Sequence, residues 1–68
     1  MEYRFSLRAA RAYADLTMQE AADQLGVNPG TIQSWEKGKT EPKPSTLAQM
    51  AELYGVRVED IFLTKNST

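Results

Sequence analysis

The chain has 68 residues, with eight Lys and Arg, nine Asp and Glu, no Cys and no His, so its net charge at neutral pH is -1. This length suits one small domain, and the lack of Cys excludes both a disulfide framework and a thiolate metal site. The lack of His removes the commonest metal ligand and the usual general base. No apolar run reaches the roughly 18 residues of a membrane span, and no signal-peptide pattern opens the chain. We therefore expect a single domain over residues 1–68 that is cytoplasmic, is not an enzyme and needs no metal or cofactor.

A first helix is predicted to begin after Ser6 and to run to about Ala14. Ser6 is a good N-cap, and Leu7, Ala10 and Arg11 fall on or near one face at helical spacing. For Arg11 two interpretations stay open: a solvated surface residue, or one partner of an ion pair.

A second and a third helix are predicted within residues 17–36, separated by a short turn. Thr17 is a good N-cap, and Glu20, three residues later, completes a capping box. Gly26 is suited to the left-handed conformation that ends a helix, and Asn28 is a good N-cap for the next one. Two helices joined by a short turn that contains Gly form a helix-turn-helix, whose second helix typically enters the DNA major groove.

The helix that begins at Asn28 has one predicted apolar side and one polar side. With Ile32 at the centre of the buried face, Gly30, Ser34 and Lys37 lie opposite it, with Gln33 at their edge. Such a face is either a small solvated surface or the surface that reads base edges. In the second case the Gln33 amide suits adenine, and Lys37 reaches a guanine or a phosphate.

The segment KGKTEPKP follows this helix directly. It is either a linker or a backbone clamp in which Lys39, Thr40 and Lys43 hold DNA phosphates. We favour the clamp because of its position, although Glu41 opposes it.

A fourth helix is predicted to begin after Ser45 and to end at Gly55, and a short fifth helix to cover residues 59–63. The fourth carries an apolar stripe at positions i, i+3, i+4 and i+7, namely Leu47, Met50, Ala51 and Tyr54. Ile61 and Phe62 are expected in the core, and any apolar surface left over in this region is expected to form a dimer interface. The predicted fold class is all-α, a compact bundle of about five short helices.

Over roughly residues 7–63 the sequence resembles the lambda-repressor-like helix-turn-helix family of the Cro/XRE type. The resemblance rests on Thr17, Glu20, Ala22, Leu25-Gly26-Val27, Thr31-Ile32, Trp35-Glu36 and Gly38-Lys39, with Pro42 and Leu47 following. It implies a DNA-binding domain in which Arg11 and Glu36 form a structural ion pair that joins the first and third helices. Relatives commonly place long polar side chains at the first two positions of the third helix, where this chain has Pro29 and Gly30.

Another departure concerns Met18. Family members often have Gln at this position to hold a phosphate, which a Met side chain cannot bind by hydrogen bonding, although its backbone N–H can. The alternative is that Met18 is only a partly exposed apolar residue.

The predicted function is that of a sequence-specific transcriptional regulator, a repressor, that binds double-stranded DNA at a palindromic operator as a homodimer. The residues expected at the DNA are Thr17, Met18, Gln19, Asn28, Pro29, Gly30, Thr31, Gln33, Ser34, Lys37, Lys39, Thr40 and Lys43. The near-neutral charge and the Pro–Gly helix start motivate an alternative, a protein-interaction or antitoxin-like module that keeps the same fold. Residues 46–63, away from the predicted DNA-facing segment, are locally acidic, with Glu52, Glu59 and Asp60 against the single basic residue Arg57.

Overall fold

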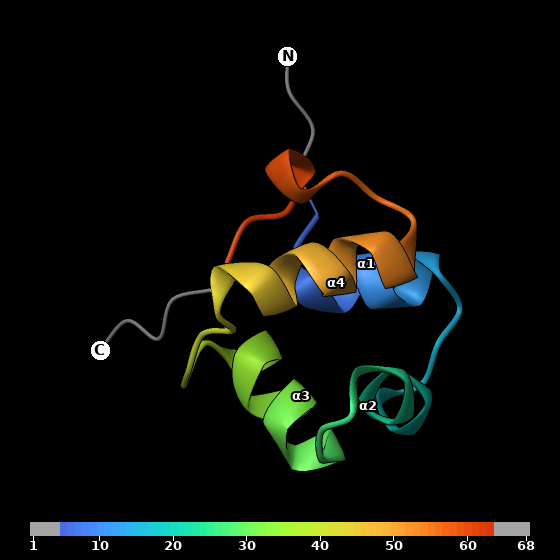
Figure 1. Cartoon of the computed structure of the whole chain (residues 1–68), viewed down its shortest axis with the longest axis vertical. Coiled ribbons are helices and arrows are strands. Elements are labelled where there is room, and N and C mark those ends of the chain that lie inside the picture. The colour runs from blue at the N-terminus through green and yellow to red at the C-terminus, as the bar shows by residue number, and fades with distance from the viewer. Residues whose placement is uncertain (1–4, 64–68) are drawn as a thin grey trace.

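A computed structural model describes residues 5–63 as a bundle of four α-helices and one short 3₁₀ helix. The elements are α1 (Leu7–Tyr13), α2 (Met18–Leu25), α3 (Pro29–Lys37), α4 (Pro44–Tyr54) and η1 (Val58–Asp60). In Figure 1, α4 lies in front of α1. The helices α2 and α3 lie together below this pair, and η1 lies at the opposite end of the molecule from α3. This arrangement confirms the all-α prediction, with four α-helices in place of about five. Within the described residues, no helix is long and apolar enough to cross a membrane.

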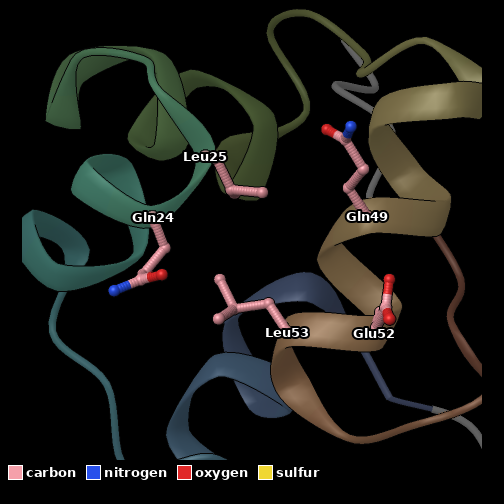
Figure 2. A pocket seen from close by; sticks show the side chains of 5 residues that line it. All are labelled: Gln24, Leu25, Gln49, Glu52 and Leu53. Atoms are coloured by element: carbon pink, nitrogen blue, oxygen red, sulfur yellow. The ribbon is translucent and has the colours of Figure 1, made fainter.

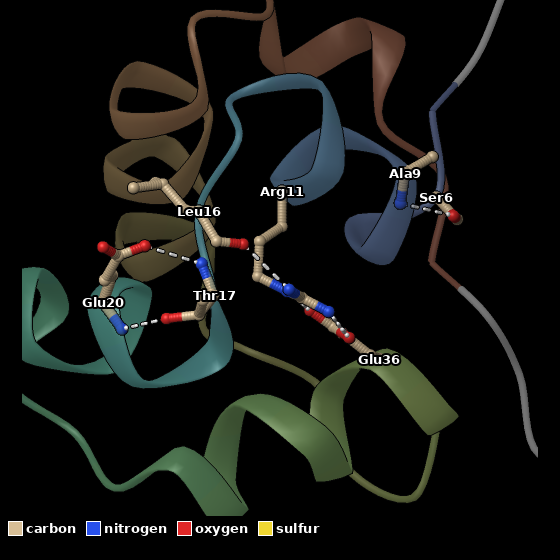
Figure 3. Close-up of polar contacts among 7 residues, drawn as sticks. All are labelled: Ser6, Ala9, Arg11, Leu16, Thr17, Glu20 and Glu36. Atoms are coloured by element: carbon tan, nitrogen blue, oxygen red, sulfur yellow. Dashed lines mark hydrogen bonds and ion pairs between the residues drawn. The ribbon is translucent and has the colours of Figure 1, made fainter.

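The first two helices begin where the local sequence chemistry predicts. The Ser6 hydroxyl accepts a hydrogen bond from the Ala9 backbone N–H at 3.1 Å. Thr17 accepts one from the Glu20 backbone N–H at 3.0 Å, and the Glu20 carboxylate accepts one from the Thr17 backbone N–H at 2.9 Å (Figure 3). Both bonds of the predicted capping box are therefore present, and Gly26 ends α2 in the left-handed conformation, with φ of 73°.

The core gathers side chains from all four helices. Ala21 and Ala22 on α2 are fully buried, and such small side chains let the α2 backbone approach its neighbours closely. Tyr54 is the largest of the fully buried residues. The buried cluster consists of Leu7, Ala10, Ala21, Ala22, Ile32, Met50 and Tyr54.

Two predicted helix starts differ in detail from the structure. The α4 helix begins at Pro44, with Lys43 in the N-cap position, so the prediction of Ser45 as the cap was wrong. A proline favours extended backbone in the residue before it and suits the first helical position itself, and Lys43 is extended, with ψ of 156°. Asn28 does occupy the N-cap position of α3, but its side chain makes no capping hydrogen bond.

The predicted fifth helix over residues 59–63 was also wrong, because only the turn Val58–Asp60 is helical. After this turn Ile61 forms a parallel bridge with Phe5. The Phe5 backbone N–H donates to the Asp60 carbonyl oxygen at 2.6 Å, and the Phe62 N–H donates to the Phe5 carbonyl oxygen at 2.9 Å. Extended backbone sends successive side chains to opposite sides. Ile61 therefore packs against the core, whereas Phe62, also predicted in the core, is 47% exposed.

The buried Tyr54 hydroxyl has no hydrogen-bond partner among the described residues. Burial, together with the smaller effect of the nearby charge of Glu36, raises the pKa of Tyr54 from 10.0 to about 12. The unfolded chain thus releases the Tyr54 proton at lower pH than the folded chain, so the folded state loses stability as the pH rises from 10 towards 12.

For Tyr54→Phe we expect the free energy of unfolding at neutral pH to rise by about 1 kcal/mol, because an unpaired buried hydroxyl costs roughly that much or more. The same variant should lose less stability than the wild type above pH 10. Urea unfolding followed by circular dichroism at neutral and alkaline pH measures both effects. A loss of stability at neutral pH would show that the hydroxyl is well partnered.

Candidate nucleic-acid interface

One face of α3 is buried and the opposite face is open to solvent. Ile32 is fully buried in the core and therefore fixes the rotation of α3 about its axis. On the other side Gly30, Gln33 and Lys37 are exposed, while Ser34 is half-buried. The side chains predicted to meet base edges thus lie on one outward surface of a helix whose inner surface is anchored.

The start of α3 lies beside this surface. Asn28 is exposed, and Pro29 and Thr31 are half-buried. A Cβ atom added to Gly30 would meet no atom within 4 Å, so the backbone at this position faces open space. A DNA strand at the wall of a groove could therefore approach the α3 backbone closely at Gly30.

The Arg11 side chain joins α1 to α3 at the edge of the outward surface. Its Nε donates to Glu36 Oε2 at 2.6 Å, its Nη2 to Glu36 Oε1 at 3.1 Å and its Nη1 to the Leu16 carbonyl oxygen at 2.9 Å (Figure 3). The Arg11 side chain is 13% exposed and the Glu36 side chain 4% exposed. The hydrogen bonding of the Arg11 guanidinium to the Glu36 carboxylate is the main cause of the raised pKa of Arg11. Arg11 is therefore a clamp between two helices and not a solvated surface residue.

A hollow of about 210 Å³ lies between α1, the start of α2 and α3. It brings together three predicted DNA-contacting residues, Met18, Gln33 and Lys37, with the Arg11–Glu36 pair. Arg8 also lines this hollow, and the sequence interpretation missed it. The available signal was spacing, because Arg8 lies one turn before Arg11 on the same face of α1.

The other predicted contact residues lie outside this hollow. Lys39, Thr40 and Lys43 are exposed in the loop between α3 and α4. Gln19 is exposed on α2, but its side-chain amide donates to Asp23 Oδ1 at 2.9 Å. The Thr17 hydroxyl oxygen serves the cap of α2. These two polar groups already have partners, so they are less available for an incoming ligand than the loop lysines.

A second hollow, between α2 and α4, contains none of the predicted site residues (Figure 2). Figure 2 shows Leu25 and Leu53 pointing toward each other across it, with the polar side chains around them. Its lining residues are Gln24, Leu25, Gln49, Glu52 and Leu53. One carboxylate and no cation line it, so this hollow does not suit a nucleic-acid backbone.

Comparison with known proteins shows relatives of similar size and larger. An uncharacterized HTH-type transcriptional regulator of Methanocaldococcus jannaschii is 40% identical over 57 residues, which are 84% of this chain and 86% of that protein. The transcriptional repressor RstR of the cryptic phage CTXphi from Vibrio cholerae is 34% identical over 81% of this chain and 50% of its own length. The transcriptional activator BcrR of Enterococcus faecalis is 30% identical over 61 residues. These are 90% of this chain but only 30% of BcrR.

No solved structure matches the chain significantly. The sequence profile of the helix-turn-helix family, however, matches residues 7–61, which include all four α-helices and η1. The two helices that the motif requires, α2 and α3, are joined at Gly26 by the short turn that the motif describes. The chain therefore belongs to the helix-turn-helix family.

Proposed function

We propose that the chain is a sequence-specific DNA-binding transcriptional regulator that inserts α3 into the major groove. The observation that carries this proposal is the outward face of α3, where Gln33 and Lys37 are exposed while Ile32 anchors the opposite side. A helix held in this way can enter a groove without rearranging the core. Relatives named as transcriptional regulators support the same function.

The proposed contacts fall into two classes. Gln33 and Ser34 address base edges, and Pro29 and Gly30 let the start of α3 lie close to the groove. Backbone phosphates are held by the loop after α3 and by the start of α2, where the backbone N–H groups and the helix dipole favour an anion. The residues proposed for this second class, with the caps and turns next to them, are Thr17, Met18, Gln19, Asn28, Thr31, Lys39, Thr40 and Lys43.

Titration with random duplex DNA at several salt concentrations tests the proposal against the protein-interaction alternative. Phosphate contacts release counterions, so the logarithm of the affinity should fall linearly with the logarithm of salt, with a slope of about -0.9 for each phosphate contacted. A slope near zero would favour the alternative, in which the helix-turn-helix meets another protein.

For Gln33→Ala we expect the affinity for the preferred operator, selected from a random DNA pool, to fall by about 5- to 150-fold, since one good base contact is worth roughly 1–3 kcal/mol. Selectivity at one base pair should fall with it, while the salt dependence stays unchanged. Gln49→Ala is the matched control, because Gln49 is an exposed glutamine of α4 that lines the other hollow. Full affinity and selectivity in Gln33→Ala would remove Gln33 from the interface.

We further propose that the protein acts in the cytoplasm as a homodimeric repressor without catalytic activity. A single module of this size offers few base contacts, and two-fold pairing on half-sites about one DNA turn apart supplies the rest. The likeness to the phage repressor RstR supports repression. The exposed Val58, in η1, and Phe62, two residues after it, supply the apolar surface for pairing.

For Phe62→Lys we expect the dimer dissociation constant to rise about tenfold or more, because a charged group would replace an apolar anchor. Analytical ultracentrifugation measures this constant, and a thermal unfolding curve checks that the monomer stays folded. An unchanged dimer, or a wild type that is monomeric on its operator, would contradict the proposed interface.

A further inference from the structure

The hollow between α1, α2 and α3 has an unusual distribution of charge. Four of the six residues that line it are charged: Arg8, Arg11, Glu36 and Lys37. Arg11 and Glu36 neutralise each other through two hydrogen bonds at 2.6 and 3.1 Å. The remaining net charge belongs to Arg8 on α1 and Lys37 on α3.

Arg8 and Lys37 both keep their charges available to a ligand. Both side chains are exposed, and among the described residues neither lies within salt-bridge distance of a carboxylate. The Arg11–Glu36 pair joins the two helices that carry them, so it holds the backbones of α1 and α3 together beside this hollow. Two cations at the rim of one hollow attract an anion that can contact both.

We propose that Arg8 and Lys37 bind one and the same phosphate of the DNA backbone above the Arg11–Glu36 pair. This inference rests on the proposed function and deepens it in two ways. It extends the DNA-binding surface to α1, and it assigns Lys37 to the backbone and not to guanine. Gln33, which lines the same hollow, then remains a base-reading side chain next to this phosphate.

The chemistry of the lining favours a phosphodiester. A guanidinium presents paired N–H donors that match the two non-bridging oxygens of a phosphodiester. An ammonium adds a compact positive charge beside them. The Met18 side chain also lines the hollow and offers no hydrogen bond to a base edge. Lys37 on the outer face of α3 has Arg8 as its neighbour across the hollow, and repulsion between the two cations is relieved when an anion lies between them.

A scan of methylphosphonate substitutions along the selected operator tests this assignment, since each substitution neutralises one phosphate. We expect one phosphate in each half-site whose neutralisation weakens the wild type about 5- to 20-fold, because a charge-assisted contact is worth roughly 1–2 kcal/mol. Arg8→Gln and Lys37→Gln should each be weakened less than the wild type at this same phosphate, because only one of the two cations remains to contact it. Both variants should reduce the slope of affinity against salt and keep the ranking of operator sequences.

Two further variants separate a specific contact from a general charge effect. Arg8→Lys keeps the cation and should retain most of the affinity. Arg57→Gln removes one positive charge, as Arg8→Gln does, but Arg57 is an exposed residue beside η1 that is paired with Asp60. The affinity of the Arg57→Gln variant for DNA should therefore match that of the wild type. Thermal unfolding of each variant confirms that the fold is kept, as expected for exposed side chains.

The results that would overturn the assignment are distinct from those that would overturn the proposed function. If Arg8→Gln binds like the wild type, or if every methylphosphonate affects both proteins equally, Arg8 does not hold a phosphate. If Lys37→Gln changes which bases are preferred, Lys37 reads a base. If the wild type itself shows no salt-dependent binding to any duplex, the proposed function and this inference both fail.

Discussion

Replacing Arg11 with Met is expected to lower the free energy of unfolding by about 3–5 kcal/mol, the usual cost of leaving a buried charge without its partner. The Glu36 side chain is only 4% exposed, and in this variant it would lose both hydrogen bonds from the guanidinium. The Leu16 carbonyl oxygen would lose its donor as well. Because a domain of this size rarely has more than about 3–5 kcal/mol of stability from its core, the variant should be largely unfolded. Urea unfolding followed by circular dichroism measures the loss.

The double variant Arg11→Met/Glu36→Leu serves as the internal check on this explanation. Replacing both charges with apolar side chains removes the uncompensated carboxylate, so most of the lost stability should return. Recovery should stop roughly 1 kcal/mol short, because the Leu16 carbonyl oxygen still lacks its donor. Arg57→Met is the matched control: Arg57 is 72% exposed and its Asp60 partner keeps access to solvent, so stability should hardly change. If Arg11→Met is as stable as the wild type, the pair does not clamp α1 to α3.

The second large effect is expected for Ile32→Ala, which should destabilise the fold by about 2–5 kcal/mol. Ile32 is fully buried in a cluster that includes Ala21 and Ala22 of α2. Their short side chains cannot extend into the space left by the missing carbons, so a cavity should remain. Ile32→Val removes a single methylene and should cost only about 0.5–1.5 kcal/mol. Denaturant titration of both variants gives the two values.

The same pair of variants separates stability from recognition. Ile32 does not belong to the outward face of α3, so Ile32→Ala should keep the operator preference of the wild type. Its apparent affinity should fall only by the fraction of chain that is unfolded, and excess operator should restore the helical signal, because a ligand that binds the folded state stabilises it. A changed base preference would mean that the rotation of α3 depends on more than this one anchor.

Several features of the fold could be predicted from short stretches of sequence. Ser6 and the Thr17–Glu20 capping box fix two helix starts, and Gly26 fixes a helix end, through hydrogen bonds or backbone angles that involve residues three or four apart. The rotation of α3 also followed from spacing alone, since Ile32 is buried and Gln33 is exposed. These features depend on local interactions that neighbouring residues make whatever the rest of the chain does.

The wrong predictions share a different cause. For residues 59–63, the acidic start and the apolar residues after it favoured a helix, yet the backbone of Ile61 pairs with Phe5 from the other end of the described chain. For Ser45, the proline before it moved the helix start to Pro44. The first error came from a partner distant in sequence, and the second from giving the side-chain cap more weight than proline geometry.

The helix-turn-helix, the capping box of α2 and the outward face of α3 could all be predicted from the sequence alone, because each depends on spacing within one or two turns. Which cations share a hollow, in contrast, depends on how the helices pack. Arg8 and Lys37 lie on different helices, and they line one hollow because the Arg11–Glu36 pair and the buried Ile32 fix α1 against α3. The packing of one helix on another is set by many contacts acting together, and no local pattern in the chain encodes that sum.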